Sequence, residues 1–152
     1  MCSAIFMYWT TMRLLSNSPQ PIMVVSSESM EPTFYRGDLI LLWNRQRDVQ
    51  VGDIPVVWFA GRPLPMVHRA IKVYYNQSSP TAEQLILTKG DNNLVDDTSI
   101  YPPGRPFIQQ QDIIGLVRGY IPVMGLFALL AKEGPWVLYL SLAFLLVASI
   151  VL

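Results

Sequence analysis

The sequence predicts a mainly β protein in which one small antiparallel β domain lies between two membrane-associated apolar segments. Three observations support this prediction. The central chain contains short apolar runs separated by Gly, Pro, Asn and Asp, which is typical of strands joined by turns. Both ends of the chain are rich in apolar residues. Only 14% of the 152 residues are charged, and the mean hydropathy is +0.32. A chain of this length suits one domain.

The N-terminal segment, residues 1–16, contains an apolar run from Cys2 to Thr11 that Arg13 follows closely. This run is too short to cross a bilayer, which takes about 20 residues. We therefore expect a truncated membrane anchor, of the kind that an incomplete gene model or a fragment would leave. The breaker cluster Asn17–Pro21 then separates this anchor from the β domain, residues 19–123.

Apolar runs with turn residues at their ends predict the strands of the domain. A polar hairpin loop is expected from Asn76 to Glu83, and an Asn- and Asp-rich loop from Lys89 to Ser99. Residues 66–75 are expected to form one continuous strand, with His68 and Lys72 on the same face because side chains alternate along a strand. The expected strands are residues 22–25, 39–43, 54–59, 66–75, 85–88 and 113–123.

The C-terminal part, residues 124–152, is expected to form a membrane-associated helix. The stretch Gly134–Leu152 has no charged residue and would span roughly 28 Å as a helix, close to the thickness of a hydrocarbon core. Trp136 and Tyr139 near its start suit an interfacial aromatic anchor. The alternative is a buried C-terminal helix, but the segment is apolar on all faces.

The composition also excludes several functions. A net charge of zero gives no electrostatic footprint for a nucleic acid, so we expect no such partner. Cys2 is the only cysteine, so neither an intrachain disulfide nor a cysteine metal cluster can form. The Asp-rich loop lacks the order of ligands found in an EF-hand, which argues against calcium. We expect no metal and no cofactor.

Ser29 stands where the first strand ends in a polar turn, a position suited to a nucleophile. A serine hydroxyl needs a base, and His68 is the only histidine in the chain. Lys72 and Lys89 are alternative bases on the residue pattern alone. One aspartate of the loop after Lys89 would accept the ring N–H of His68 and stabilise the imidazolium.

The motifs resemble those of the type I signal peptidases, and more closely the endoplasmic reticulum type, the catalytic-subunit family of the signal peptidase complex. Four boxes occur in the order typical of that family, with His in place of Lys in the base box. The resemblance covers the chain from about Pro21 to the C-terminus. The boxes are Ser27–Pro32 with Arg36–Asp38, then Val67–Arg69, then Leu87–Asn93, and then Val95–Asp97.

The resemblance implies roles for five residues. Ser29 would be the nucleophile, His68 the general base and Asp97 the acid of a catalytic triad, with Asp91 as an alternative or supporting acid. The hydroxyl of Ser27 and the backbone N–H of Ser29 would form the oxyanion hole. Such a donor is typically worth about 3 kcal/mol of transition-state stabilisation.

Two departures from the family pattern are visible. Glu28 stands where the first box usually has Gly, and we expect its side chain to point to solvent, because neighbouring residues of an extended chain alternate faces. The N-terminal anchor is shorter than the family's membrane helix.

The resemblance further implies a membrane-bound serine endopeptidase that removes signal peptides from pre-proteins in the endoplasmic reticulum. It would be a single-pass type II protein with a lumenal catalytic domain, assembled with the other subunits of the complex in the lipid bilayer. The substrate would add as an extended strand, with small side chains read next to the cleavage site. Asn76 begins a glycosylation sequon in a loop that would then be lumenal.

Two other functions compete with this one. A self-cleaving repressor protease on a related β fold would need a basic DNA-binding module and a Lys base, and neither is evident. An inactive or scaffolding membrane subunit that keeps the fold would be expected to lack Ser29, His68 or the acidic pair, and all of these residues are present.

Overall fold

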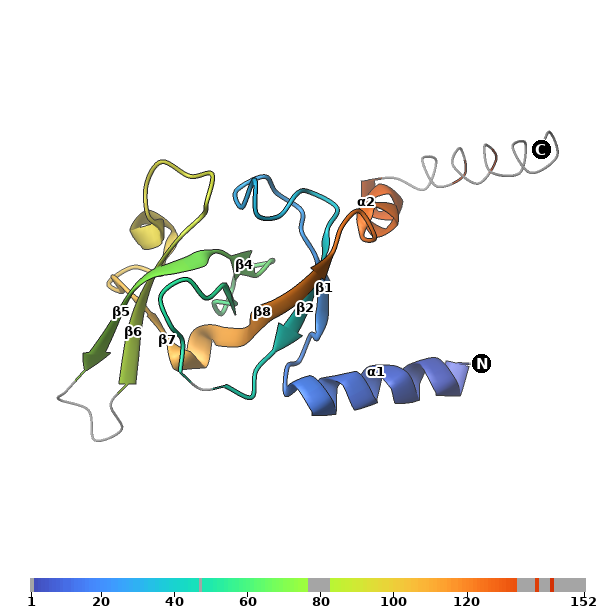
Figure 1. The fold of residues 1–152 in the computed structure, drawn as a ribbon, viewed down its shortest axis with the longest axis horizontal. Helices are drawn as coiled ribbons and strands as arrows, with labels where there is room; N and C mark the ends of the chain where they lie inside the picture. The colour runs from blue at the N-terminus through green and yellow to red at the C-terminus, as the bar shows by residue number, and fades with distance from the viewer. Residues whose placement is uncertain (1, 47, 77–82, 134–138, 140–142, 144–152) are drawn as a thin grey trace.

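The computed structural model describes residues 2–46, 48–76, 83–133, 139 and 143 (Figure 1). Of the predicted C-terminal helix, residues 124–133 are described and include the helix α2 (Leu126–Glu133), whereas residues 134–152 lie outside the described residues except for 139 and 143. Within the described ranges, none of the helices combines the length and apolar character needed to cross a membrane. The membrane-spanning segments of the prediction are not tested by this structure.

Two antiparallel sheets make up the domain, which confirms the prediction of a mainly β, antiparallel fold. The five-stranded sheet has the order β1-β2-β8-β3-β4, and the three-stranded sheet has the order β5-β6-β7. The strands are β1 (Ile22–Val24), β2 (Leu39–Trp43), β3 (Pro55–Val57), β4 (Met66–Val67), β5 (Arg69–Asn76), β6 (Glu83–Lys89), β7 (Ile108–Gln109) and β8 (Ile113–Ile121).

The core consists of two clusters of buried apolar side chains. The larger lies where the two sheets meet, and fully buried Ile86 and Leu116 belong to it. The smaller lies beneath the turn that follows β1 and includes Met30 and Phe34, which are 1% and 3% exposed. Burying each such side chain stabilises the fold by roughly 1.5–3 kcal/mol. The second cluster therefore fixes the turn that carries Ser29.

The continuous strand predicted for residues 66–75 is wrong. The chain pairs with β3 as β4, leaves the ladder at His68, and pairs with β6 as β5 in the other sheet. A register shift between Ala70 and Lys72 also changes which side chains face inward. Ala70 is buried, and so is His68, but Lys72 is exposed. Apolar alternation alone does not reveal such a bulge, because it leaves the composition of the strand unchanged.

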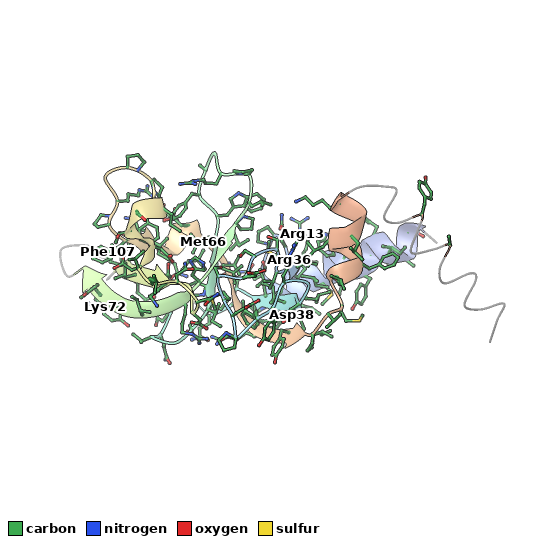
Figure 2. All side chains as sticks on the ribbon, turned by 90° about the horizontal axis from the view of Figure 1, so that it is seen from above. Arg13, Arg36, Asp38, Met66, Lys72 and Phe107 are labelled. Carbon is green, nitrogen blue, oxygen red and sulfur yellow. The ribbon has the colours of Figure 1, made fainter. Side chains whose placement is uncertain are left out.

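The sequence prediction also missed β7 and the two short 3-10 helices, η1 (Asp97–Ile100) and η2 (Gln110–Asp112). They occur in a part of the chain whose prolines favour coil. The helices α1 (Cys2–Ser16) and α2 (Leu126–Glu133) both lie at the β1–β2 end of the molecule, away from β5–β7 (Figure 1). Viewed from above, Arg13 and Arg36 mark this end, and Lys72 and Phe107 mark the other (Figure 2).

Candidate active site

Ser29 lies in the turn between β1 and β2, and backbone hydrogen bonds hold both ends of this turn. Two hydrogen bonds close its base: the N–H of Val25 donates to the carbonyl oxygen of Asp38, and the N–H of Gly37 donates to the carbonyl oxygen of Val25, both at 2.9 Å. Inside the turn the N–H of Phe34 donates to the carbonyl oxygen of Met30 at 3.0 Å. The half-buried Ser29 therefore sits on a fixed support.

His68 occupies the position where the chain passes from one sheet to the other. Its Nε2 lies 3.0 Å from the hydroxyl oxygen of Ser29, and its Nδ1 lies 2.7 Å from Oδ2 of Asp97. Both His68 and Asp97 are buried, at 6% and 1% exposure. An ionised carboxylate only accepts hydrogen bonds, so the contact with Asp97 places the ring proton of His68 on Nδ1. Nε2 is then left to accept the proton of Ser29.

Asp97 opens the 3-10 helix η1. The preceding residue, Asp96, caps this helix by accepting hydrogen bonds from the backbone N–H of Thr98 at 3.1 Å and from its hydroxyl at 2.6 Å. The hydrogen bond from Thr98 is the main cause that lowers the pKa of the Asp96 carboxyl. The cap thus turns the first aspartate of the pair to solvent and the second inward toward His68.

Asp91 has different partners and does not contact His68. Its two carboxylate oxygens accept from Arg69 at 2.8 and 2.6 Å, and the hydroxyl of Thr33 donates to Oδ2 at 2.5 Å. The hydrogen bonds from Arg69 are the main cause that lowers the pKa of Asp91, against the opposing effect of burial. The same bidentate pair raises the pKa of Arg69.

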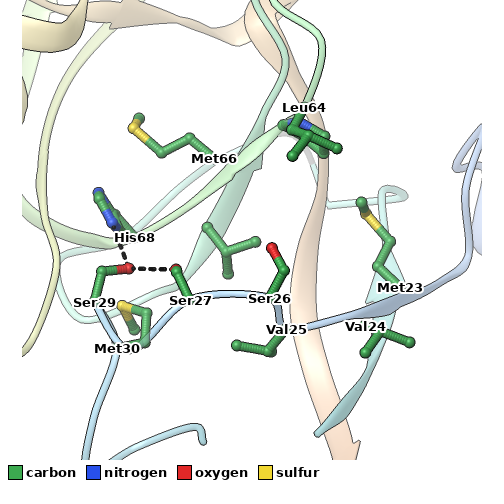
Figure 3. Close-up of a pocket in the computed structure, with 12 residues that line it drawn as sticks. Met23, Val24, Val25, Ser26, Ser27, Ser29, Met30, Leu64, Met66 and His68 are labelled. Carbon is green, nitrogen blue, oxygen red and sulfur yellow. Dashed lines mark hydrogen bonds between the residues drawn. The ribbon is translucent and has the colours of Figure 1, made fainter. Parts of the chain in front are cut away.

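The remaining predicted residues lie as follows. The Ser27 hydroxyl is exposed and lies 3.2 Å from that of Ser29 (Figure 3). Lys72 is exposed and Lys89 half-buried, whereas the nitrogen beside the Ser29 hydroxyl is that of His68. Glu28 is exposed. Asn76 ends β5, and the rest of its sequon lies outside the described residues.

A cleft of about 330 Å³ opens beside Ser29 and His68 (Figure 3). The opposite outer edges of the five-stranded sheet form its two walls, β1 with the residues after it and β4 with the residues before it. Most of the exposed lining is apolar. The lining residues are Met23–Ser27, Ser29, Met30 and Leu64–His68.

Two residues for which the sequence predicted no role lie beside Asp97: Thr88 contacts it directly, and Tyr101 contacts Thr88. The hydroxyl of Thr88 on β6 donates to Oδ2 of Asp97 at 2.7 Å, and the hydroxyl of Tyr101 lies 2.9 Å from that of Thr88. Thr88 stands in an alternating strand and Tyr101 beside a proline pair, so neither carries a local signal.

A serine hydroxyl, an imidazole and a buried carboxylate in hydrogen-bonded series, at the edge of an apolar cleft, form an arrangement suited to nucleophilic acyl transfer. This is the chemistry of the serine hydrolases.

Comparison with known proteins identifies the family. The signal peptidase complex catalytic subunit SEC11 of Ajellomyces capsulatus (strain H143) is 43% identical, with 94% of this chain and 81% of the relative covered. The subunit of the same name from Pyrenophora tritici-repentis is 48% identical, covering 88% and 76%. That of Candida dubliniensis is 43% identical, covering 97% and 87%. No protein-family model matches the chain.

The chain is a serine protease and belongs to the SEC11 family of catalytic subunits of the signal peptidase complex. The family assignment made from the four sequence boxes is thereby confirmed.

Proposed function

We propose that this chain cleaves signal peptides from pre-proteins at the endoplasmic reticulum membrane by a Ser29–His68–Asp97 mechanism. The observation that carries the mechanism is the hydrogen-bonded series from the Ser29 hydroxyl through both nitrogens of His68 to Asp97, at 3.0 and 2.7 Å. His68 takes the proton of Ser29 as the serine oxygen attacks the scissile carbonyl. Asp97 stabilises the imidazolium that forms.

The reaction then proceeds through an acyl-enzyme. The negative charge on the carbonyl oxygen is stabilised by the backbone N–H of Ser29 and the hydroxyl of Ser27. His68 gives its proton to the leaving amine, which is the new N-terminus of the mature protein. It next removes a proton from a water molecule, which releases the signal peptide from Ser29.

The walls of the cleft support binding of the substrate as an extended strand. β1 and β4 are the two edges of the five-stranded sheet, and edge strands present unpaired backbone groups to a peptide. We expect this cleft of about 330 Å³ to take small side chains near the scissile bond. Small residues before the cleavage site are the mark of a signal peptide.

The membrane arrangement is part of the proposal. Residues 1–16 and 124–152 would associate with the bilayer and residues 19–123 would form the lumenal domain, in a single-pass type II protein. The exposed apolar side chains of α1, among them Ile5, Phe6 and Leu14 at 69–70% exposure, support contact with lipid. The other subunits of the complex, and a glycan on Asn76, complete the expected setting.

The nucleophile and the base are tested by Ser29→Ala and His68→Ala in the full chain, assembled and assayed on a pre-protein in microsomes. We expect each to lower the cleavage rate by roughly 10³-fold or more, because each removes a member of one reacting unit. Ser99→Ala, at an exposed position of η1, is the matched control and should keep full activity. Undiminished cleavage by either variant would refute the mechanism and would favour a scaffolding role.

The choice between the two acids is tested by Asp97→Asn against Asp91→Asn. The first leaves His68 without its carboxylate and is expected to lower kcat by up to about 10⁴-fold. The second breaks the pair with Arg69 but leaves the contact between His68 and Asp97 intact. Full activity of Asp97→Asn beside an inactive Asp91→Asn would overturn the assignment.

A further inference from the structure

A chain of buried hydroxyl groups lies behind the carboxylate of Asp97. Thr88, 1% exposed, donates its hydroxyl to Oδ2 of Asp97 at 2.7 Å, the same oxygen that His68 approaches. The hydroxyl of Tyr101, 5% exposed, lies 2.9 Å from both the hydroxyl oxygen and the backbone nitrogen of Thr88. Neither side chain lines the substrate cleft.

Hydrogen bonds in this series of hydroxyl groups can run in only one direction, from Tyr101 to Thr88 to Asp97. Ionised Asp97 can only accept, so the single hydroxyl proton of Thr88 must point to it. The contact between Thr88 and Tyr101 must then use the proton of Tyr101. Burial is the main cause that raises the pKa of Tyr101, so the phenol keeps that proton at neutral pH. The backbone N–H of Thr88 satisfies the Tyr101 oxygen in turn.

The series of hydroxyl groups is also held in place at Tyr101, its end away from Asp97. The ring of Tyr101 belongs to the core between the two sheets and meets Phe59 edge to face, with ring centroids 5.9 Å apart. Tyr101 directly follows η1, the helix that Asp97 opens, so one short turn holds both groups around Thr88 of β6. Asp97 is thereby supported from a packed strand and from the core.

We propose that Thr88 and Tyr101 are positioning residues that hold the Asp97 carboxylate in its orientation toward His68. The inference rests on the proposed triad mechanism. Two donors converge on one carboxylate oxygen, so loss of the Thr88 hydroxyl leaves that oxygen with His68 alone and lets the carboxylate rotate. Neither residue touches substrate, so the effect falls on kcat and not on KM.

The first test uses Thr88→Val, which keeps the shape of the side chain, and Thr88→Ser, which keeps the hydroxyl. In the full chain within the assembled complex, we expect Thr88→Val to lower kcat by about tenfold or more with KM unchanged, since hydrogen bonds to charged groups are the stronger ones. Thr88→Ser should restore most of the rate. Tyr101→Phe should lower kcat by about threefold or more. The effect is smaller because the Tyr101 hydroxyl acts on Asp97 only through Thr88.

The matched control is Thr98→Val. Thr98 also donates its hydroxyl to an aspartate, the capping residue Asp96, but that pair is exposed, and the backbone N–H of Thr98 still donates to the cap when the hydroxyl is lost. We expect kcat to be unchanged. A loss equal to that of Thr88→Val would mean that the effect reflects the helix as a whole and would overturn the inference.

Combination with Asp97→Asn separates this inference from the mechanism on which it rests. If Thr88 acts through Asp97, Thr88→Val should cost little or nothing further in an Asp97→Asn background. A full additional loss there would overturn the inference, and so would Thr88→Val with wild-type kcat while Asp97→Asn is impaired. Wild-type kcat in Asp97→Asn itself would instead refute the proposed mechanism.

Discussion

Asp91 and Asp97, the two candidate acids that follow β6, have different partners. Asp97 is buried against His68, whereas Asp91 is held in a bidentate pair by Arg69. Arg69 directly follows His68 in the chain and also donates to the carbonyl oxygen of Gly52 at 3.0 Å. The pair with Asp91 therefore ties the residue next to the base to the loop that follows β6.

This pair has a pH dependence that can be measured. Folding lowers the pKa of Asp91, so near pH 4 the unfolded chain binds more protons than the folded one. Its stabilisation is complete above the ordinary aspartate pKa of about 3.9 and is lost as the pH falls through the lowered value. We expect Asp91→Asn to be less stable than wild type by roughly 1–3 kcal/mol at pH 7.

That difference should begin to shrink below about pH 4, as Asp91 of the unfolded chain takes up its proton, and should disappear below the lowered pKa of Asp91 in the folded state. Unfolding of the full chain in detergent, followed by circular dichroism between pH 7 and 3, measures it. Asp48→Asn, at an exposed position, is the control and should change little. A difference between wild type and Asp91→Asn that stays constant over this range would contradict the prediction.

The resemblance to a family supplied the candidate residues, whereas residue patterns alone left several of them open. A lone histidine and an Asp-rich loop do not say which aspartate pairs with which base. That choice depends on the cap at Asp96, which turns Asp97 inward, and on Arg69, which forms an ion pair with Asp91. No role was predicted for Thr88 or Tyr101, because their contacts with Asp97 and with each other form only where β6 and η1 meet.

At the scale of elements, the loop after β6 packs directly on the turn that carries the nucleophile. The backbone N–H of Asn92 donates to the carbonyl oxygen of Ser29 at 2.9 Å, and its side chain donates to that of Glu28 at 3.1 Å. Gly90 lies so close that an added Cβ would stand 2.6 Å from the Ser29 oxygen. The loop therefore leads to Asp97 and also fixes the backbone of Ser29, the proposed acid and nucleophile.

Gly90→Ala should consequently displace the nucleophile. The new methyl group would meet backbone at Ser29 and also the side chain of Asn93, 2.7 Å away, so the turn must shift. We expect kcat/KM to fall by about 10²-fold, the usual cost of a misplacement of 1 Å. Gly119→Ala is the control, because its Cβ would meet Leu41 at an ordinary 3.5 Å. Equal activity of the two variants on a pre-protein would refute this packing argument.

The placement of His68 shows why strand prediction falls short at a functional site. Alternation extends across residues 66–75, and the sequence gives no sign that the chain changes sheets there. The change removes His68 from both ladders and leaves its ring free to face Ser29 and Asp97. By contrast, β2 spans the range predicted for it, because turn residues bound its apolar run on both sides.

At the scale of the whole molecule, both helices lie at the β1–β2 end (Figure 1). The candidate active site reaches from that end to the three-stranded sheet, because Ser29 lies between β1 and β2 whereas Thr88 is on β6 and Asp97 opens η1. Arg45 fastens α1 to the domain by donating to the carbonyl oxygens of Leu14 and Leu15 at 2.8 and 2.7 Å. A cation at the end of a helix also interacts favourably with its dipole.

This arrangement predicts that lipid reaches one end of the molecule only. Trp9 lies on α1 and is 38% exposed, whereas Trp58 follows β3 and donates its ring N–H to the carbonyl oxygen of Arg62. In full-length variants that keep a single tryptophan, reconstituted in vesicles, brominated lipid should quench most of the emission of Trp9 and little of that of Trp58. Retained cleavage of a pre-protein verifies that each variant is folded. Equal quenching of the two would mean that the β domain itself enters the bilayer, and would contradict the proposed division into a membrane-associated end and a lumenal domain.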